Sequence, residues 1–307
     1  MEAGFVVRWA VSTLGCPEWD AATVPARVGQ IGFNAIEWRG GDDGTVRTSW
    51  SPVRRAALRR AVSEAGLASI AVTSYPNLLT VDRAVVAASF DGIEAHVALA
   101  RDLAAPWVRI FLGVADDDAP REAHIGRAID GIALALDRTA GSGVGLAIEP
   151  HDDLVRAADL QPILAAFEDD RLAVVWDVGN AWAAGEPPAA GFDTYRGQIA
   201  WTQVKDGTGR DATWRLSDLG AGDVPIREAL ELLAEPGARR MAPGRTSQAF
   251  GTREAPPVVS LEWERAWDDR LAPPEIAFPA SLAWLRSVAA DVARSPAALV
   301  SAEAADQ

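Results

Sequence analysis

The feature of this 307-residue chain that most constrains its fold is a repeated alternation of short apolar runs with longer segments of helical periodicity. Apolar residues that recur every three to four positions indicate amphipathic helices, whereas short runs rich in Val, Ile and Trp indicate buried strands. Strands that are apolar nearly throughout are typical of a parallel sheet covered by helices. Eight such runs predict strands, at residues 5–11, 34–39, 68–74, 107–113, 144–150, 172–178, 199–205 and 257–263.

Eight strand–helix units are the number that closes a (β/α)8 TIM barrel, and single barrels of ~250 residues are common. An open doubly wound sheet is the competing α/β architecture, but no glycine-rich phosphate loop follows the first run. We therefore predict a single-domain TIM barrel over residues 1–295. Residues 235–257, which are rich in Gly, Pro and polar side chains, are expected to be a mobile insertion before the eighth strand, and residues 296–307 a frayed tail.

Composition and charge limit the partners of the chain. The formal net charge is −14 and the pI is near 4.7, whereas nucleic-acid-binding proteins carry a basic patch, so no nucleic-acid partner is expected. No apolar run approaches the ~20 residues of a membrane helix, and the first fifteen residues lack the features of a signal peptide. The single cysteine, Cys16, cannot form an internal disulfide. We expect a cytoplasmic protein without membrane association.

Polar side chains stand at the ends of the last four predicted strands. In a TIM barrel the carboxyl ends of the strands form one rim, where reacting groups gather. Residues i and i+2 of a strand share a face, so a polar residue and the one two positions later can point the same way. The residues concerned are Glu149 with His151, Asp177, Gln203 with Lys205, and Glu262 with Glu264.

Three carboxylates that converge on one mouth repel each other unless a cation lies between them, so this pattern predicts a metal site. Oxygen ligands from Glu149, Asp177, Gln203 and Glu262 suit a hard ion such as Mn²⁺ or Mg²⁺ better than Zn²⁺. Three negative charges around a divalent ion leave about one negative charge uncompensated. This charge favours the protonated form of Lys205, the only lysine in the chain. If desolvation instead lowers its pKa, Lys205 can act as a base.

The chain also resembles a known family in an ordered set of motifs. STLGCPEWD, GFNAIEWR, VRIFLG, IEPH, WDVGN, VKDG followed by LGAGDVP, and SLEWE, which span about residues 5–290, are similar to the xylose isomerase-like barrels of sugar phosphate isomerases and epimerases. In that family one metal is held by Glu, Asp, His and Glu from strands five to eight. The resemblance implies Glu149, Asp177 and Glu262 as ligands, with Gln203 where His is usual and Asn180 where many members have a second His.

The resemblance implies a divalent-metal-dependent isomerase or epimerase that acts on a sugar or sugar-like hydroxy-ketone through an enediolate. Glu149 and Glu262 are expected to transfer the proton, with His151 or Lys205 as the alternative base. Arg109, Trp38, Trp176 and Asn180 are the candidate substrate-binding residues, although Arg109 could instead support a carboxylate, and the tryptophans could pack between sheet and helices.

Two other functions stay open at this point. The same enediolate can expel a β-substituent, which makes a lyase such as a keto-inositol dehydratase or the catalytic subunit of a carbon-glycoside deglycosidase acting on 3-oxo-glycosides. A degenerate barrel would only bind sugars. The expected partner is a small-molecule sugar or sugar derivative, and a homo-oligomer or a small partner subunit is left open.

Overall fold

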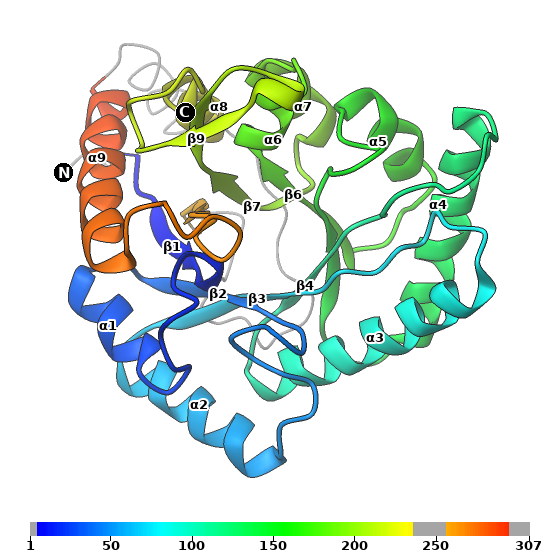
Figure 1. Cartoon of the computed structure of the whole chain (residues 1–307), viewed down its shortest axis with the longest axis horizontal. Helices are drawn as coiled ribbons and strands as arrows, with labels where there is room; N and C mark the ends of the chain where they lie inside the picture. Colours follow the sequence, from blue (N-terminus) through cyan, green and yellow to red (C-terminus); the bar gives the residue numbers. More distant parts are fainter. Residues whose placement is uncertain (1–4, 236–255, 295–307) are drawn as a thin grey trace, which may run out of the picture.

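The computed structural model describes residues 5–235 and 256–294. Its centre is a closed barrel of eight parallel strands in the spatial order β1-β10-β7-β6-β5-β4-β3-β2 (Figure 1). Each predicted strand is present and somewhat shorter than predicted, so the (β/α)8 fold class is confirmed. The barrel strands are β1 (Arg8–Ser12), β2 (Ala35–Arg39), β3 (Ala68–Thr73), β4 (Trp107–Ile110), β5 (Gly145–Ile148), β6 (Leu172–Asp177), β7 (Ile199–Val204) and β10 (Val258–Leu261).

Helices surround the barrel as a ring (Figure 1). Several begin at side chains that accept hydrogen bonds from free N–H groups, as Ser51 does for Arg54 and Asp82 for Ala84. The helices are α1 (Val24–Ile31), α2 (Pro52–Glu64), α3 (Arg83–Asp102), α4 (Arg121–Arg138), α5 (Ala157–Ala165), α6 (Val178–Ala183), α7 (Pro188–Tyr195), α8 (Ile226–Leu233) and α9 (Pro274–Ala293), with short 3₁₀ turns η1 (Thr13–Gly15) and η2 (Asp211–Thr213).

The barrel closes where the first and last strands meet. β1 pairs with β10 in parallel, from Arg8 opposite Val258 to Val11 opposite Leu261. The residues that face the barrel axis form an inner core of alanines, branched side chains and the tryptophans Trp107 and Trp201, while a larger outer core fills the space between strands and helices. Because successive side chains of a strand point to opposite faces, each strand serves both cores.

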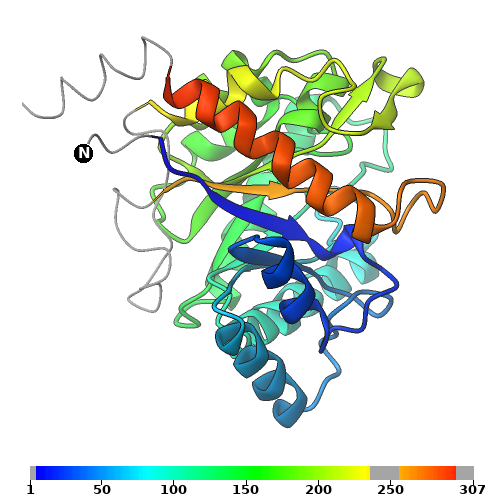
Figure 2. The same ribbon diagram turned by 90° about the vertical axis from the view of Figure 1, so that its left-hand side faces the viewer.

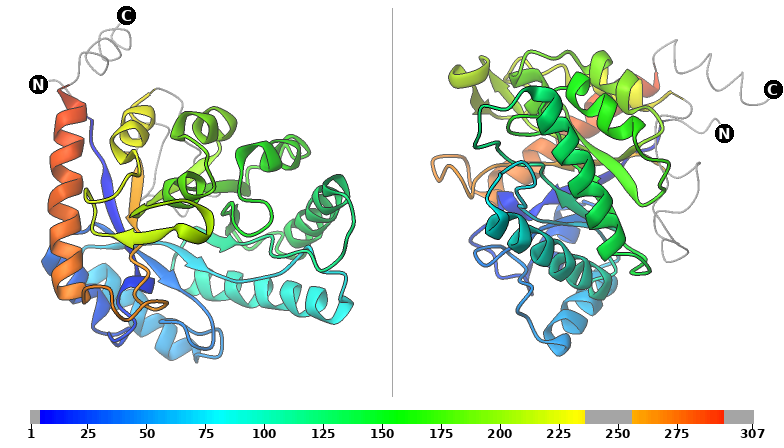
Figure 3. Two further views of the ribbon diagram at one scale, coloured as in Figure 1. Left: turned by 45° about the horizontal axis from the view of Figure 1, so that its top comes forward. Right: turned by 90° about the vertical axis from the view of Figure 1, so that its right-hand side faces the viewer.

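Helix α9 packs along the outside of this closure, beside β1 and α8 (Figures 2 and 3). It is the one helix among the described residues that is long and apolar enough to cross a membrane, with a mean hydropathy of 1.2 and 44% of that window buried. This differs from the expectation that no segment approaches such a length. Its buried face, which includes Phe278, Leu282 and Leu285, covers the barrel, as in the core helix of a folded domain.

A small antiparallel hairpin, β8 (Asp206–Thr208) with β9 (Arg215–Ser217), follows β7 and is not predicted from the sequence. The carboxylate of Asp206 holds it to the next loop, because it accepts hydrogen bonds from the backbone N–H groups of Gly220, Gly222 and Val224.

The predicted mobile insertion at 235–257 and the frayed tail at 296–307 fall outside the described residues, apart from 235, 256 and 257, and stay predictions.

Candidate metal centre

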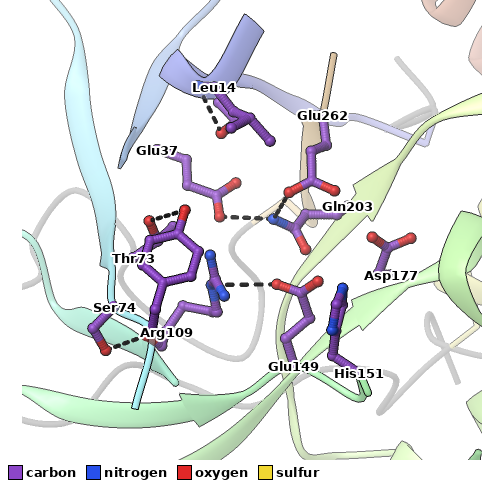
Figure 4. A network of polar contacts seen from close by, with 12 residues as sticks. Leu14, Glu37, Thr73, Ser74, Arg109, Glu149, His151, Asp177, Gln203 and Glu262 are labelled. Carbon is purple, nitrogen blue, oxygen red and sulfur yellow. Dashed lines mark hydrogen bonds and ion pairs between the residues drawn. The ribbon is translucent and has the colours of Figure 1, made fainter. Parts of the chain in front are cut away.

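The carboxyl ends of the last four barrel strands bring together the four side chains predicted to bind a metal. Asp177 ends β6 and lies opposite Gln203 of β7, while Glu149 and Glu262 follow directly after β5 and β10. None of the four is more than 5% exposed. Oxygens of Glu149, Asp177 and Glu262 lie within 4.8 Å of one another. Figure 4 shows the four side chains directed toward one space.

Glu37 of β2 adds a further carboxylate to this centre, although it is not among the site residues predicted from the sequence. It accepts hydrogen bonds from Gln203 Nε2 at 2.8 Å and from Ser260 Oγ at 2.7 Å. Burial, and then the charge of Glu262, raises the pKa of Glu37 to about 7. The signal available for it was a carboxylate between the apolar residues Ile36 and Trp38 of the strand.

Lys205 contacts three carboxylates. Its Nζ lies 2.9 Å from Asp177 Oδ2, 2.6 Å from Glu262 Oε2 and 2.6 Å from Glu264 Oε1. Burial alone would lower the pKa of Lys205, but these three charges outweigh it and raise the pKa well above its ordinary value. These contacts favour the protonated Lys205 expected from the sequence over the alternative in which desolvation makes it a base.

Arg109 and Asn180, both predicted to bind substrate, flank Glu149. Asn180 Nδ2 donates to Glu149 Oε1 at 3.1 Å, and Arg109 Nε lies 3.3 Å from Glu149 Oε2. The guanidinium of Arg109 is buried and lies over the rings of Phe111 and Tyr75, at 3.8 and 4.6 Å from their centroids. Both side chains therefore fix the position of Glu149, which is one of the candidate metal ligands.

The three carboxylates of the centre differ in pKa. Burial raises the pKa of Glu149 well above its usual range, although Arg109 opposes the shift. Burial likewise raises the pKa of Asp177 to about 6, against the lowering effect of Lys205. For Glu262, burial acts in the same direction, but the ammonium of Lys205 more than compensates and leaves its pKa below the ordinary value.

His151 lies at the mouth of the centre and is held on two sides. Its Nδ1 is 2.8 Å from Asp152 Oδ1, and its ring stacks on Phe111 with centroids 4.2 Å apart. Because a carboxylate oxygen accepts, Nδ1 is the nitrogen that donates to Asp152, and Nε2 is the ring nitrogen that Asp152 does not engage. Asp152 itself has a left-handed backbone, φ 52°, which is costly for a residue other than glycine. The pair thus presents one defined nitrogen of His151.

Trp38 and Trp176 do not line the centre, and the prediction that they bind substrate is wrong. Both are fully buried in the outer core between strands and helices, where Trp38 Nε1 donates to Ser69 and Trp176 packs near Phe192. The reason is the strand alternation, since each is the sequence neighbour of a side chain, Glu37 or Asp177, that faces the barrel axis.

The residues present fit a divalent metal ion. Gln203 Oε1 is buried and accepts no hydrogen bond from any described residue, while Glu149 Oε2 and Asp177 Oδ2 lie 3.3 and 2.9 Å from the cations of Arg109 and Lys205. Buried polar atoms normally have partners, and oxygen donors are the ligands of hard cations. The carboxylates around the centre also exceed its cationic side chains, Arg109 and Lys205, by three. These carboxylates are Glu37, Glu149, Asp177, Glu262 and Glu264.

The fold is a closed (β/α)8 barrel, and a buried carboxylate cluster lies at the carboxyl ends of its strands. The class is therefore that of a TIM-barrel protein with a candidate metal centre. The chain belongs to the xylose isomerase-like TIM barrel family, whose sequence profile matches residues 25–242. This confirms the resemblance seen in the sequence. No curated protein matches the chain by sequence.

Solved structures of similar fold cover nearly the whole chain. The IolI protein with a bound zinc atom has a TM-score of 0.73 at 15% identity, over 93% of this chain and 99% of that one. An L-ribulose 3-epimerase gives 0.72 at 17%, over 96% and 98%. The probable 3-DHS dehydratase AsbF from Bacillus anthracis gives 0.69 at 13%, over 91% and 98%. At these identities the likeness shows the fold.

Proposed function

We propose that this protein is a divalent-metal-dependent isomerase or epimerase of a sugar or sugar-like hydroxy-ketone. The observation that carries the proposal is the cluster of Glu149, Asp177 and Glu262, whose oxygens lie within 4.8 Å of one another beside the amide of Gln203. These four residues would hold the ion, for which their oxygen donors favour Mn²⁺ or Mg²⁺. When bound, such an ion supplies Lewis-acid stabilisation of the enediolate charge.

Glu149 and Glu262 are suited to opposite halves of a proton transfer. In the metal-free protein the pKa of Glu149 is raised and that of Glu262 is lowered, so their surroundings distinguish the two carboxyls, and a bound ion would lower the pKa of both. Pairs of groups whose environments push their pKa values apart serve as acid and base in many enzymes. Lys205, which stays an ammonium, contributes positive charge rather than a base.

The test is incubation of the metal-loaded protein with ketoses, keto-inositols and 3-oxo-glycosides in D₂O. An isomerase or epimerase incorporates deuterium at carbon without losing a substituent, and chelator-treated protein serves as the control. Absence of both metal binding and exchange would instead support a barrel that only binds sugars.

A lyase is the second candidate, favoured by the imidazole of His151 at the same mouth of the barrel. His151 presents a single nitrogen, fixed by Asp152, and can protonate a leaving oxygen after a carboxylate has taken the carbon-bound proton. The fold neighbour AsbF is described as a probable dehydratase. Elimination in the D₂O experiment supports this reading, and a small co-purifying subunit would point to a deglycosidase.

A further inference from the structure

The amide of Gln203 is held in one orientation by its neighbours. Gln203 is fully buried, and its Nε2 donates to Glu37 Oε1 at 2.8 Å and to Glu262 Oε1 at 3.0 Å. Both amide hydrogens are therefore engaged by carboxylates. The other amide atom, Oε1, has no hydrogen-bond partner among the described residues, and Figure 4 shows it directed to the space beside Glu149 and Asp177.

The reverse orientation is disfavoured on electrostatic grounds. A flipped amide would place its oxygen against Glu262, whose carboxylate is ion-paired with Lys205 and has no proton to donate, and would turn its hydrogens away from both acceptors. Glu37 is itself fixed, because Ser260 Oγ donates to its second oxygen at 2.7 Å. Ser260 lies opposite Gln203 in the β7–β10 pair, so Ser260, Glu37 and Gln203 form a connected chain of hydrogen bonds.

We infer that Glu37 is a positioning residue that directs Gln203 Oε1 into the carboxylate cluster and so makes the centre selective for hard, oxygen-preferring cations. The inference rests on the proposed function and goes beyond it, because it assigns a role to a carboxylate that need not touch the ion or the substrate. Residues that orient a ligand commonly change metal affinity by about 10- to 100-fold when they are removed. Four oxygen donors suit Mn²⁺ and Mg²⁺, whereas an imidazole in the same place favours Zn²⁺.

The experiment measures binding of Mn²⁺, Mg²⁺ and Zn²⁺ by calorimetry to chelator-treated full-length protein and to matched variants. Glu37→Met removes the acceptor for the Gln203 amide, whereas Glu37→Gln removes the same charge and keeps an acceptor oxygen. We expect Mn²⁺ affinity to fall about 10- to 100-fold in Glu37→Met and to be largely retained in Glu37→Gln. Gln203→His should shift the Mn²⁺/Zn²⁺ affinity ratio toward Zn²⁺, because a ring nitrogen replaces the amide oxygen.

The outcomes separate this inference from the proposed function. If the wild-type protein binds none of the three ions, the metal centre itself is refuted. If the wild type binds Mn²⁺ but both Glu37 variants bind it equally well, or equally poorly, the positioning role is overturned while the metal centre stands. Should Glu37→Met fail to fold, Gln203→His decides, since an unchanged Mn²⁺/Zn²⁺ ratio would show that the amide oxygen is not a ligand.

Discussion

Lys205 neutralises part of a buried carboxylate cluster. Replacing it therefore shows how much this lysine contributes to the stability of the fold and how much to turnover. In Lys205→Met, Asp177, Glu262 and Glu264 lose their shared cation. Removal of one partner of a buried ion pair costs about 3–5 kcal/mol, so we expect the metal-free variant to melt at a much lower temperature than the wild type. Added Mn²⁺ should restore most of this loss, because the ion replaces the missing positive charge. Thermal melts with chelator and with Mn²⁺ measure both effects.

The same variant should keep its metal and lose turnover, with Lys205→Arg as the control that preserves the charge. Loss of the metal in Lys205→Met would contradict this and would mean that the ammonium supports the ligands rather than the reaction.

Glu262 is the carboxylate whose pKa is depressed, and it contacts both Gln203 and Lys205. Glu262→Gln keeps the shape but removes the charge, so we expect metal occupancy and activity to fall together, each by at least about 10-fold. Metal analysis of the purified variant beside its kinetics checks this. Full activity with normal metal content would exclude Glu262 as a ligand.

At the residue scale, position along the chain predicted the centre better than side-chain identity did. Polar residues at strand ends indicated Glu149 and Asp177 because the topology of a parallel barrel puts all such ends on one rim. The same reasoning failed for Trp38 and Trp176, because a strand buried on both faces is apolar on both, and its sequence does not tell which face points inward. Glu37 was not among the predicted site residues because it lies at the middle of its strand rather than at the carboxyl end.

At the element scale, the short helix α6 couples β6 to the centre. Asp177 caps it by accepting from Asn180 N at 2.9 Å, and its second residue is Gly179. A Cβ atom on Gly179 would lie 2.4 Å from Lys205 Cγ and 3.3 Å from Asp177 Oδ1. The helix can therefore approach the ammonium only because that position has no side chain.

Gly179→Ala should displace Lys205 and destabilise the protein by about 1–3 kcal/mol through overpacking, with a fall in turnover. The matched control is Gly92→Ala in α3, where an added Cβ meets nothing within 4 Å and removal of a helical glycine should be neutral or stabilising. Melting temperatures and kinetics of the two variants test this. Equal behaviour of both would show that the contact with Lys205 is not required.

Strand and helix identity could be predicted from periodicity, but the hairpin of β8 and β9 could not. Its strands are three residues long, and it depends on the carboxylate of Asp206, which binds backbone groups of Gly220 and Val224 far along the chain. Such hydrogen bonds leave no periodic signal in the sequence, because they join residues that are neighbours only after folding.

At the scale of the whole molecule, the closed barrel makes the centre an internal one. The ring of strands places carboxylates from β5, β6 and β10 around a shared space, away from solvent. Desolvation then raises the pKa values of Glu149 and Asp177, a cost that a bound cation would offset. The stability of the fold and the occupancy of the centre are therefore linked, and pH should control both.

The raised pKa values of these carboxyls determine whether stability rises or falls with pH. Because the pKa of Asp177 is about 6 in the folded protein and near its ordinary, lower value when unfolded, the metal-free folded protein holds more protons than the unfolded chain between these values, and it loses stability from this group as pH rises toward 6. A metal ion binds the deprotonated carboxylates, so its competition with protons weakens over the same range. We expect the rise in melting temperature on adding Mn²⁺ to be small at about pH 5 and larger above about pH 7. Melts with chelator and with Mn²⁺ at each pH isolate the centre, since groups remote from it contribute equally to both. A metal-induced rise at pH 5 as large as that at pH 7.5 would show that Asp177 and Glu149 do not bind the ion.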